Sequence, residues 1–156
     1  VNFTNTGNKR FNPNLYNCGK VCLSILGTYV GPTASQTEKW NTSSTLYQVL
    51  LSIQAQILVE KPYFNEPGYQ NSYGTSEGEK KSEDYNKNIK LYTMQYAMLD
   101  LLEKNSYPEF KNIIQNHFKI KKNKIIENLN KWESEAKTKS LYSKIKDKLI
   151  AKLNSI

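Results

Sequence analysis

The spacing of apolar and polar residues changes character along the chain. Residues 1–4 alternate, and residues 20–26 form a short apolar run, so both are expected to be strands. A glycine-, serine- and threonine-rich loop is expected over 27–39, and from about residue 43 the apolar residues recur at helical spacing instead. An order of short strands, a long connection and then helices predicts an α+β fold, with most of the sheet upstream of residue 1.

Five helices are predicted. Ser43 or Ser44 is expected to cap the first, which ends before Pro62, and a long polar loop follows over 61–81. Ser82 is expected to cap the second, which ends at a break over 105–108. Three further helices carry their apolar residues within 110–118, 125–136 and 141–153.

Composition favours a folded domain. The chain has 156 residues, of which 38% are hydrophobic and 12% aromatic, and this argues against disorder. No apolar run approaches the roughly 18 residues that a membrane span requires. The first residue is Val1, in what reads as the middle of a strand, so the sequence is treated as a fragment and no targeting signal is inferred from its start.

The net charge of +8 is concentrated at one end. Residues 1–110 hold ten basic and ten acidic residues, whereas residues 111–156 hold twelve lysines and four acids. We therefore predict a core over 1–118 and a basic helical extension over 119–156. The extension suits a solvated helical pair packed on the core, or a surface for an acidic partner, RNA or a membrane. It has no stacking-aromatic motif and no glycine-rich phosphate loop, so nucleic-acid binding is not favoured.

Both cysteines lie in the stretch FNPNLYNCGKVC, at Cys18 and Cys22. A disulfide between them would close a very small loop, and zinc normally takes four ligands where the chain offers two cysteines and the distant His117. His117 itself reads as a packed or surface residue. Free thiols in a reducing cytoplasmic or nuclear setting are expected, and Cys22 remains either a small core residue or a nucleophile.

The same stretch resembles the ubiquitin-conjugating (E2) enzymes. Their signature is His-Pro-Asn with the thioester-forming cysteine eight residues after the Asn, and here Asn12-Pro13-Asn14 is followed at that spacing by Cys22. Trp40 matches the start of the family's Trp-Ser-Pro element. The stretches GKVCLSILGTYVGP and SIQAQILVEKPYFNEPGY are similar to the large Z-type enzymes and to the conjugating domain of the giant inhibitor-of-apoptosis protein. The resemblance runs from about residue 1 to 135.

The resemblance implies a fold, a reaction and a set of residues. The fold is an antiparallel meander sheet packed on helices, and the reaction transfers ubiquitin or a related modifier from an activating enzyme (E1) to Cys22 as a thioester. The modifier then passes to a substrate lysine or a ligase (E3), without a metal or a small cofactor. By this resemblance, Asn14 stabilises the oxyanion or holds the loop that does so, and Glu66 positions and deprotonates the incoming lysine. Tyr63 and Asn65 shape the lysine channel, and Asn12, Pro13 and Trp40 have structural roles.

The sequence departs from the family's pattern in three places. Asn12 replaces the family's mainly structural His, and Thr42 replaces the Pro of the Trp-Ser-Pro element. The family's first helix and first strands, which form much of the surface read by E1 and E3, lie outside this sequence, and without them loading is expected to fail. Two alternatives stay open: a non-catalytic interaction module of the same fold, and a basic helical nucleic-acid-binding module. Cys18 is expected to be a bystander.

Overall fold

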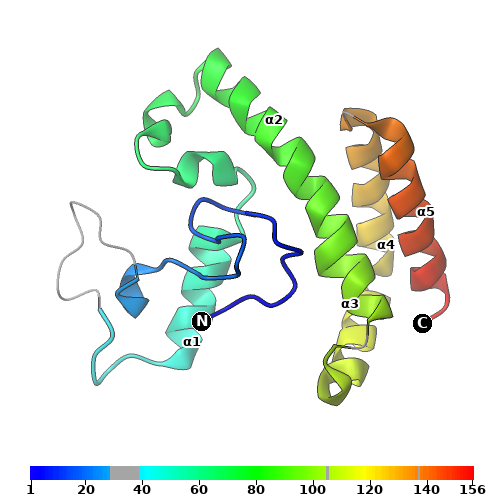
Figure 1. The fold of residues 1–156 in the computed structure, drawn as a ribbon, viewed down its shortest axis with the longest axis horizontal. Coiled ribbons are helices and arrows are strands. Elements are labelled where there is room, and N and C mark those ends of the chain that lie inside the picture. Colours follow the sequence, from blue (N-terminus) through cyan, green and yellow to red (C-terminus); the bar gives the residue numbers. More distant parts are fainter. Residues whose placement is uncertain (29–38, 105, 137) are drawn as a thin grey trace. The chain divides into compact units, whose positions relative to one another are not determined.

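The computed structural model describes residues 1–28, 39–104, 106–136 and 138–156. These residues form two compact units, Val1–Asn86 and Lys87–Ile156, and the boundary between the units lies inside helix α2 (Figure 1). Most of the loop predicted over 27–39 falls outside the described residues, as does residue 105 of the predicted helix break.

The described part of unit 1 begins with irregular chain and contains isolated β-bridges in place of strands. The bridges pair Asn2 with Lys20, Asn12 with Leu15, and Leu15 with Val21. The strand expected over 20–26 is wrong as a whole, because Ser24–Leu26 is a 3₁₀ helix. The Thr28 hydroxyl accepts the Leu23 N–H at 3.0 Å, so a local side-chain bond takes the place of a ladder bond there. The meander sheet stays a prediction.

Helix α1, Leu46–Ser52, provides the packing face of unit 1. Thr45 caps it in place of the predicted serines, since its side chain accepts the Gln48 N–H while the Gln48 side chain accepts the Thr45 N–H. The helix continues as a π-helical stretch, Ile53–Ile57. The apolar residues predicted at helical spacing in this segment are only partly buried. Val49, Ile53 and Ile57 pack with residues of the N-terminal loops, whereas Leu46 and Leu50 are exposed. The N-terminal members of this core are Leu15, Val21 and Leu23.

Helix α2, Ser76–Tyr92, follows two 3₁₀ turns, Pro62–Asn65 and Tyr69–Ser72. It begins six residues before the predicted cap: Thr75 accepts the Gly78 N–H at 3.1 Å, and Ser82 is a buried interior residue of the helix. The first two turns of α2 are polar and therefore carry no apolar spacing that would reveal them. Their acidic residues Glu77 and Glu79 suit the positive end of a helix.

Unit 2 is a helical cluster with its own core. After α2 come a π-helical stretch, Thr93–Leu99, helix α3, Asp100–Glu103, and a 3₁₀ turn, Pro108–Phe110. Helices α4, Lys111–Glu135, and α5, Lys139–Asn154, pack side by side (Figure 1). The buried core residues are Met94, Leu99, Phe118, Ile125, Leu129, Tyr142, Ile145, Leu149 and Leu153.

Two of the predicted helices are one continuous helix. The predictions over 110–118 and 125–136 merge into α4, because the connecting residues 119–124 (KIKKNK) are polar but contain no Gly or Pro to end a helix. The helix predicted over 141–153 is confirmed as α5. The proposed core–extension boundary between residues 118 and 119 lies inside α4 and stays a prediction. Among the described residues, no helix is long and apolar enough to cross a membrane.

Candidate active site

The turn at Asn12-Pro13-Asn14 is held by the Asn12 side chain. Asn12 is 1% exposed; its Oδ1 accepts the Asn14 N–H at 2.8 Å and its Nδ2 donates to the Ile57 carbonyl at 3.0 Å. One amide thus closes an Asx turn and ties it to the last residue of the π-helical stretch. Pro13 is buried beside it, and Asn14 is half-buried.

Cys22 is joined to this turn through the backbone. Its N–H donates to the Asn14 carbonyl at 2.8 Å, which fixes the cysteine beside the residue that lies eight positions earlier. Both cysteines are free thiols; Cys22 is 7% exposed, whereas Cys18 is exposed.

Gly19 allows the loop between Tyr16 and Cys22 to close. It has φ +86°, its carbonyl accepts the Phe3 N–H at 2.8 Å, and a Cβ at this position would lie 1.9 Å from the Phe3 carbonyl oxygen. Only a residue without a side chain fits both the left-handed backbone and that close approach.

Tyr16 and Arg10 also belong to the site, although the sequence did not single them out. A hydrogen bond with the Cys22 side chain is the main cause that raises the pKa of the Tyr16 hydroxyl. The Arg10 guanidinium lies over the Tyr16 ring, 5.1 Å from its centroid. The charges of both Arg10 and Glu66 also act on Tyr16, the first lowering and the second raising its pKa. The side chains of one segment, Arg10, Tyr16 and Cys22, and that of Glu66 from a second segment therefore share one local electrostatic environment.

The predicted lysine-channel residues Tyr63 and Asn65 lie within the Pro62–Asn65 turn. Glu66 caps this turn, and its Oε2 lies 3.4 Å from Arg10 Nη2, which also donates to the Pro13 carbonyl at 2.7 Å. Asn65 Nδ2 donates to the Gln56 carbonyl at 2.6 Å. Tyr63 packs in an aromatic cluster, 4.7 Å from the Tyr69 ring and 5.3 Å from the Phe64 ring.

Trp40, predicted as a structural residue, and His117, predicted as a packed or surface residue, make other contacts. Trp40 is 54% exposed, and the residue after it, Asn41, makes local bonds with Ser43 and Ser44. His117 is an exposed residue of α4 in unit 2 whose ring meets that of Phe118 edge to face. Within the described part of the chain, no three His, Cys, Asp or Glu side chains are grouped as a metal ion would require.

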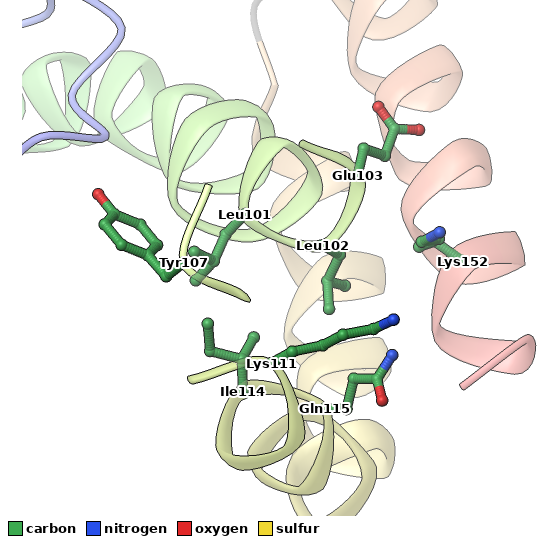
Figure 2. Close-up of a pocket in the computed structure, with 8 residues that line it drawn as sticks. All are labelled: Leu101, Leu102, Glu103, Tyr107, Lys111, Ile114, Gln115 and Lys152. Carbon is green, nitrogen blue, oxygen red and sulfur yellow. The ribbon is translucent and has the colours of Figure 1, made fainter. Parts of the chain in front are cut away.

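Unit 2 contains a cavity of about 260 Å³ that lies between α3, the first turns of α4 and the last turn of α5 (Figure 2). Three aliphatic side chains and the Tyr107 ring are accompanied by two lysines, a carboxylate and an amide. The lining residues are Leu101, Leu102, Glu103, Tyr107, Lys111, Ile114, Gln115 and Lys152. None of the predicted site residues lines this cavity.

Comparison with known proteins identifies the family. The model of the family "Ubiquitin-conjugating enzyme" matches residues 1–93. A probable ubiquitin-conjugating enzyme E2 of Acanthamoeba polyphaga mimivirus is 46% identical over 156 residues, covering 98% of this chain and 10% of that protein. The dual E2 ubiquitin-conjugating enzyme/E3 ubiquitin-protein ligase BIRC6 of Homo sapiens is 48% identical over 135 residues, covering 85% of this chain and 3% of that protein. A probable ubiquitin-conjugating enzyme E2 of Arabidopsis thaliana is 46% identical over 132 residues, covering 84% and 23%.

The chain therefore belongs to the ubiquitin-conjugating enzyme family, as the residues around Cys22 predicted. Membership implies the ubiquitin-conjugating fold for the matched region. The chain spans only 3 to 23% of the length of these three relatives.

Proposed function

We propose that this chain carries ubiquitin or a ubiquitin-like modifier as a thioester on Cys22 and transfers it to a lysine of a substrate or to a ligase. The observation that carries the proposal is the pairing of the Cys22 N–H with the Asn14 carbonyl at 2.8 Å, because it holds a free thiol against the family's signature turn. The partners are an E1, which supplies the activated modifier, and an E3 with its substrate. The setting is a reducing one, the cytoplasm or the nucleus.

The chemistry follows from the side chains. In loading, the Cys22 thiolate attacks the carbonyl of the E1-bound modifier, a new S–C bond forms, and the E1 thiol leaves. In discharge, a neutral lysine amine attacks the Cys22 thioester, an amide bond forms and the Cys22 thiolate leaves. A thiol serves both steps because it is a good nucleophile and a good leaving group near neutral pH.

Two further side chains have roles in discharge. The Asn14 amide stabilises the negative charge on the carbonyl oxygen or holds the loop that does so; losing such a donor costs roughly 10²–10³ in rate at comparable sites. Glu66 orients the lysine and accepts its proton. The support for this role is the Glu66–Arg10 contact at 3.4 Å, since Arg10 also binds the Pro13 carbonyl of the signature turn.

A loading assay tests the proposal. The chain is mixed with E1, ATP and ubiquitin and run on a non-reducing gel with and without a thiol reductant. Loading is seen as a reductant-sensitive band heavier by one ubiquitin, and the proposal predicts that this band is lost in Cys22→Ala and kept in Cys18→Ala. Loss of the band in the Cys18 variant alone would place the acceptor at Cys18 and contradict the alignment.

A second candidate is a non-catalytic interaction module of the same fold. The observation that favours it is the burial of Cys22, which is 7% exposed. If the chain does not load, a longer piece of the natural protein is assayed in the same way. Loading by the longer piece supports the enzyme, and failure there favours the interaction module.

A further inference from the structure

Arg10 connects three parts of the candidate site that are far apart in the sequence. Its Nη2 donates to the Pro13 carbonyl at 2.7 Å and lies 3.4 Å from Glu66 Oε2, 56 residues away. Its guanidinium also lies over the ring of Tyr16, at 5.1 Å from the centroid. Cys22 in turn is the main cause that raises the pKa of the Tyr16 hydroxyl, so the two side chains lie near each other.

These contacts suit an arginine. A guanidinium is planar, carries several donors and keeps its charge, so one group can bind a carbonyl and a carboxylate at its edge while its face covers an aromatic ring. The Pro13 carbonyl belongs to a turn that the buried Asn12 amide holds in place. Arg10 is therefore anchored on the rigid side of the site, and Glu66 and Tyr16 are the partners that it can position.

Glu66 has few other constraints. Its side chain is 37% exposed, and it follows a 3₁₀ turn on a surface loop. An exposed ion pair of this kind adds little to folding stability. Its effect on a reaction can be larger, because a displacement of about 1 Å of a catalytic group costs up to roughly 10²-fold in rate.

We propose that Arg10 is a positioning residue for transfer from Cys22: it sets the Glu66 carboxylate for the incoming lysine and holds Tyr16 against the Cys22 thiol. This inference rests on the proposed conjugating function of Cys22. Arg10 takes no proton and forms no bond with the modifier. It acts through the two side chains that it contacts, so its removal affects discharge to lysine more than loading from E1.

The first test separates discharge from loading. Arg10→Gln keeps an amide that can still bond the Pro13 carbonyl but removes the cation. In a single-turnover discharge to free lysine, we expect the rate at saturating lysine to fall roughly tenfold and the lysine concentration for half-maximal rate to rise, while loading changes less than about twofold. Lys20→Gln, which removes an exposed positive charge two residues before Cys22, is the matched control and is expected to behave like the unaltered chain.

A double-mutant cycle distinguishes positioning from a general structural effect. We expect the double variant Arg10→Gln, Glu66→Gln to discharge no more slowly than Glu66→Gln alone, because the effect of Arg10 on the incoming lysine runs through the Glu66 carboxylate. The charge swap Arg10→Glu, Glu66→Arg is expected to recover part of the lost rate. The proposal would be overturned if Arg10→Gln slowed loading and discharge equally and if the effects of the two single substitutions on the discharge rate added up in the double variant.

A third measurement needs no modifier or E1 and so remains readable if the chain does not load. Cys22 is alkylated with iodoacetamide in the Cys18→Ala variant. The alkylation rate is then compared with that of the double variant Cys18→Ala, Arg10→Gln. Because Arg10 keeps Tyr16 beside Cys22 in this proposal, we expect its loss to speed alkylation about threefold or more. An unchanged rate would show that Arg10 does not act on Cys22 through Tyr16 and would overturn the proposal independently of the loading assay.

Discussion

The asparagine at position 12 illustrates why one residue type is required at the turn. A side-chain amide carries an acceptor and a donor, and Asn12 uses both: Oδ1 for the Asn14 N–H and Nδ2 for the Ile57 carbonyl. The two bonds lie in a site that is 1% exposed, where water cannot replace them. The residue therefore joins the signature turn to the end of the π-helical stretch that follows α1.

Replacing Asn12 by Ala is expected to lower the free energy of unfolding by about 2–3 kcal/mol, because the Ile57 carbonyl and the Asn14 N–H lose their partner in a buried site. Denaturant unfolding measures the change. Asn17→Ala is the control: its Oδ1 accepts only an exposed Cys18 N–H, and we expect a change within about 0.5 kcal/mol. Equal effects of the two variants would show that the buried Asn12 amide is not what holds the turn.

The family resemblance identified Cys22, Asn14 and Glu66 as candidates but not Arg10 or Tyr16. The first group sits at positions that a linear motif fixes. Arg10 acquires its importance from Glu66, 56 residues later, and such a pairing leaves no local pattern in a single sequence. Tyr16 lies within the motif stretch, two residues after Asn14, and that proximity to the cysteine is the signal that could have found it.

At the scale of elements, apolar spacing located the helices better than it located their ends. It placed α5 correctly and indicated α1, but it missed the first turns of α2, where the residues are polar. It also divided α4 at a lysine-rich stretch that remains helical. Capping hydrogen bonds decide where such ends fall. Ser43, Ser44 and Thr45 are neighbouring candidates, and Thr45 is the one whose side chain meets the Gln48 N–H.

The packing of α5 on α4 includes a buried phenol that makes unit 2 sensitive to alkaline pH. The Tyr142 hydroxyl donates to the Leu129 carbonyl at 3.1 Å, and burial raises the pKa of Tyr142 above its ordinary value of 10.0. The folded state thus holds this proton more tightly than the unfolded state. The resulting contribution to stability is complete below pH 10 and declines as the pH rises above it.

Tyr142→Phe is accordingly expected to cost about 1 kcal/mol near pH 7, through loss of the hydrogen bond to Leu129, and progressively less above pH 10. Thermal or denaturant unfolding at pH 7, 9.5 and 10.5 measures the trend. Tyr47→Phe, at a residue that is 68% exposed, is the control and should differ little from the unaltered chain at each pH. A constant deficit of the Tyr142 variant over the whole range would contradict the assignment of this pH dependence to Tyr142.

At the scale of the whole chain, charge separates along the same line as the compact units. Residues 1–86 hold seven basic and seven acidic residues, whereas residues 87–156 hold fifteen lysines and seven acids. Several lysines of unit 2 are paired within it, as in the contacts of Lys90 with Glu135 and of Lys146 with Glu133. The candidate site lies in the unit whose basic and acidic residues balance.

The two units also bear on where a minimal catalytic core ends. Six of the nine buried core residues of unit 2 lie beyond residue 118: Ile125, Leu129, Tyr142, Ile145, Leu149 and Leu153. Each such side chain contributes roughly 1.5–3 kcal/mol by burial, so their joint contribution is comparable with the roughly 5–15 kcal/mol that stabilises a typical domain. A chain that stops at residue 118 should therefore be unable to keep the rest of unit 2 folded.

Deletion of 119–156 is expected to remove more helix than the deleted residues contain, because the segment from Thr93 to Phe118 loses the surface against which it packs. Circular dichroism per molecule, with limited proteolysis of that segment, measures the effect. Deletion of only Ser155 and Ile156, which follow α5, is the control and should change both readouts much less, because it removes only one partly buried side chain, Ile156, from the edge of the core. A truncated chain that keeps the remaining helices protected would instead support a core that ends at residue 118. If the segment unfolds while Cys22 still loads, the working core is unit 1 alone, and the basic helices form a separate module attached to it.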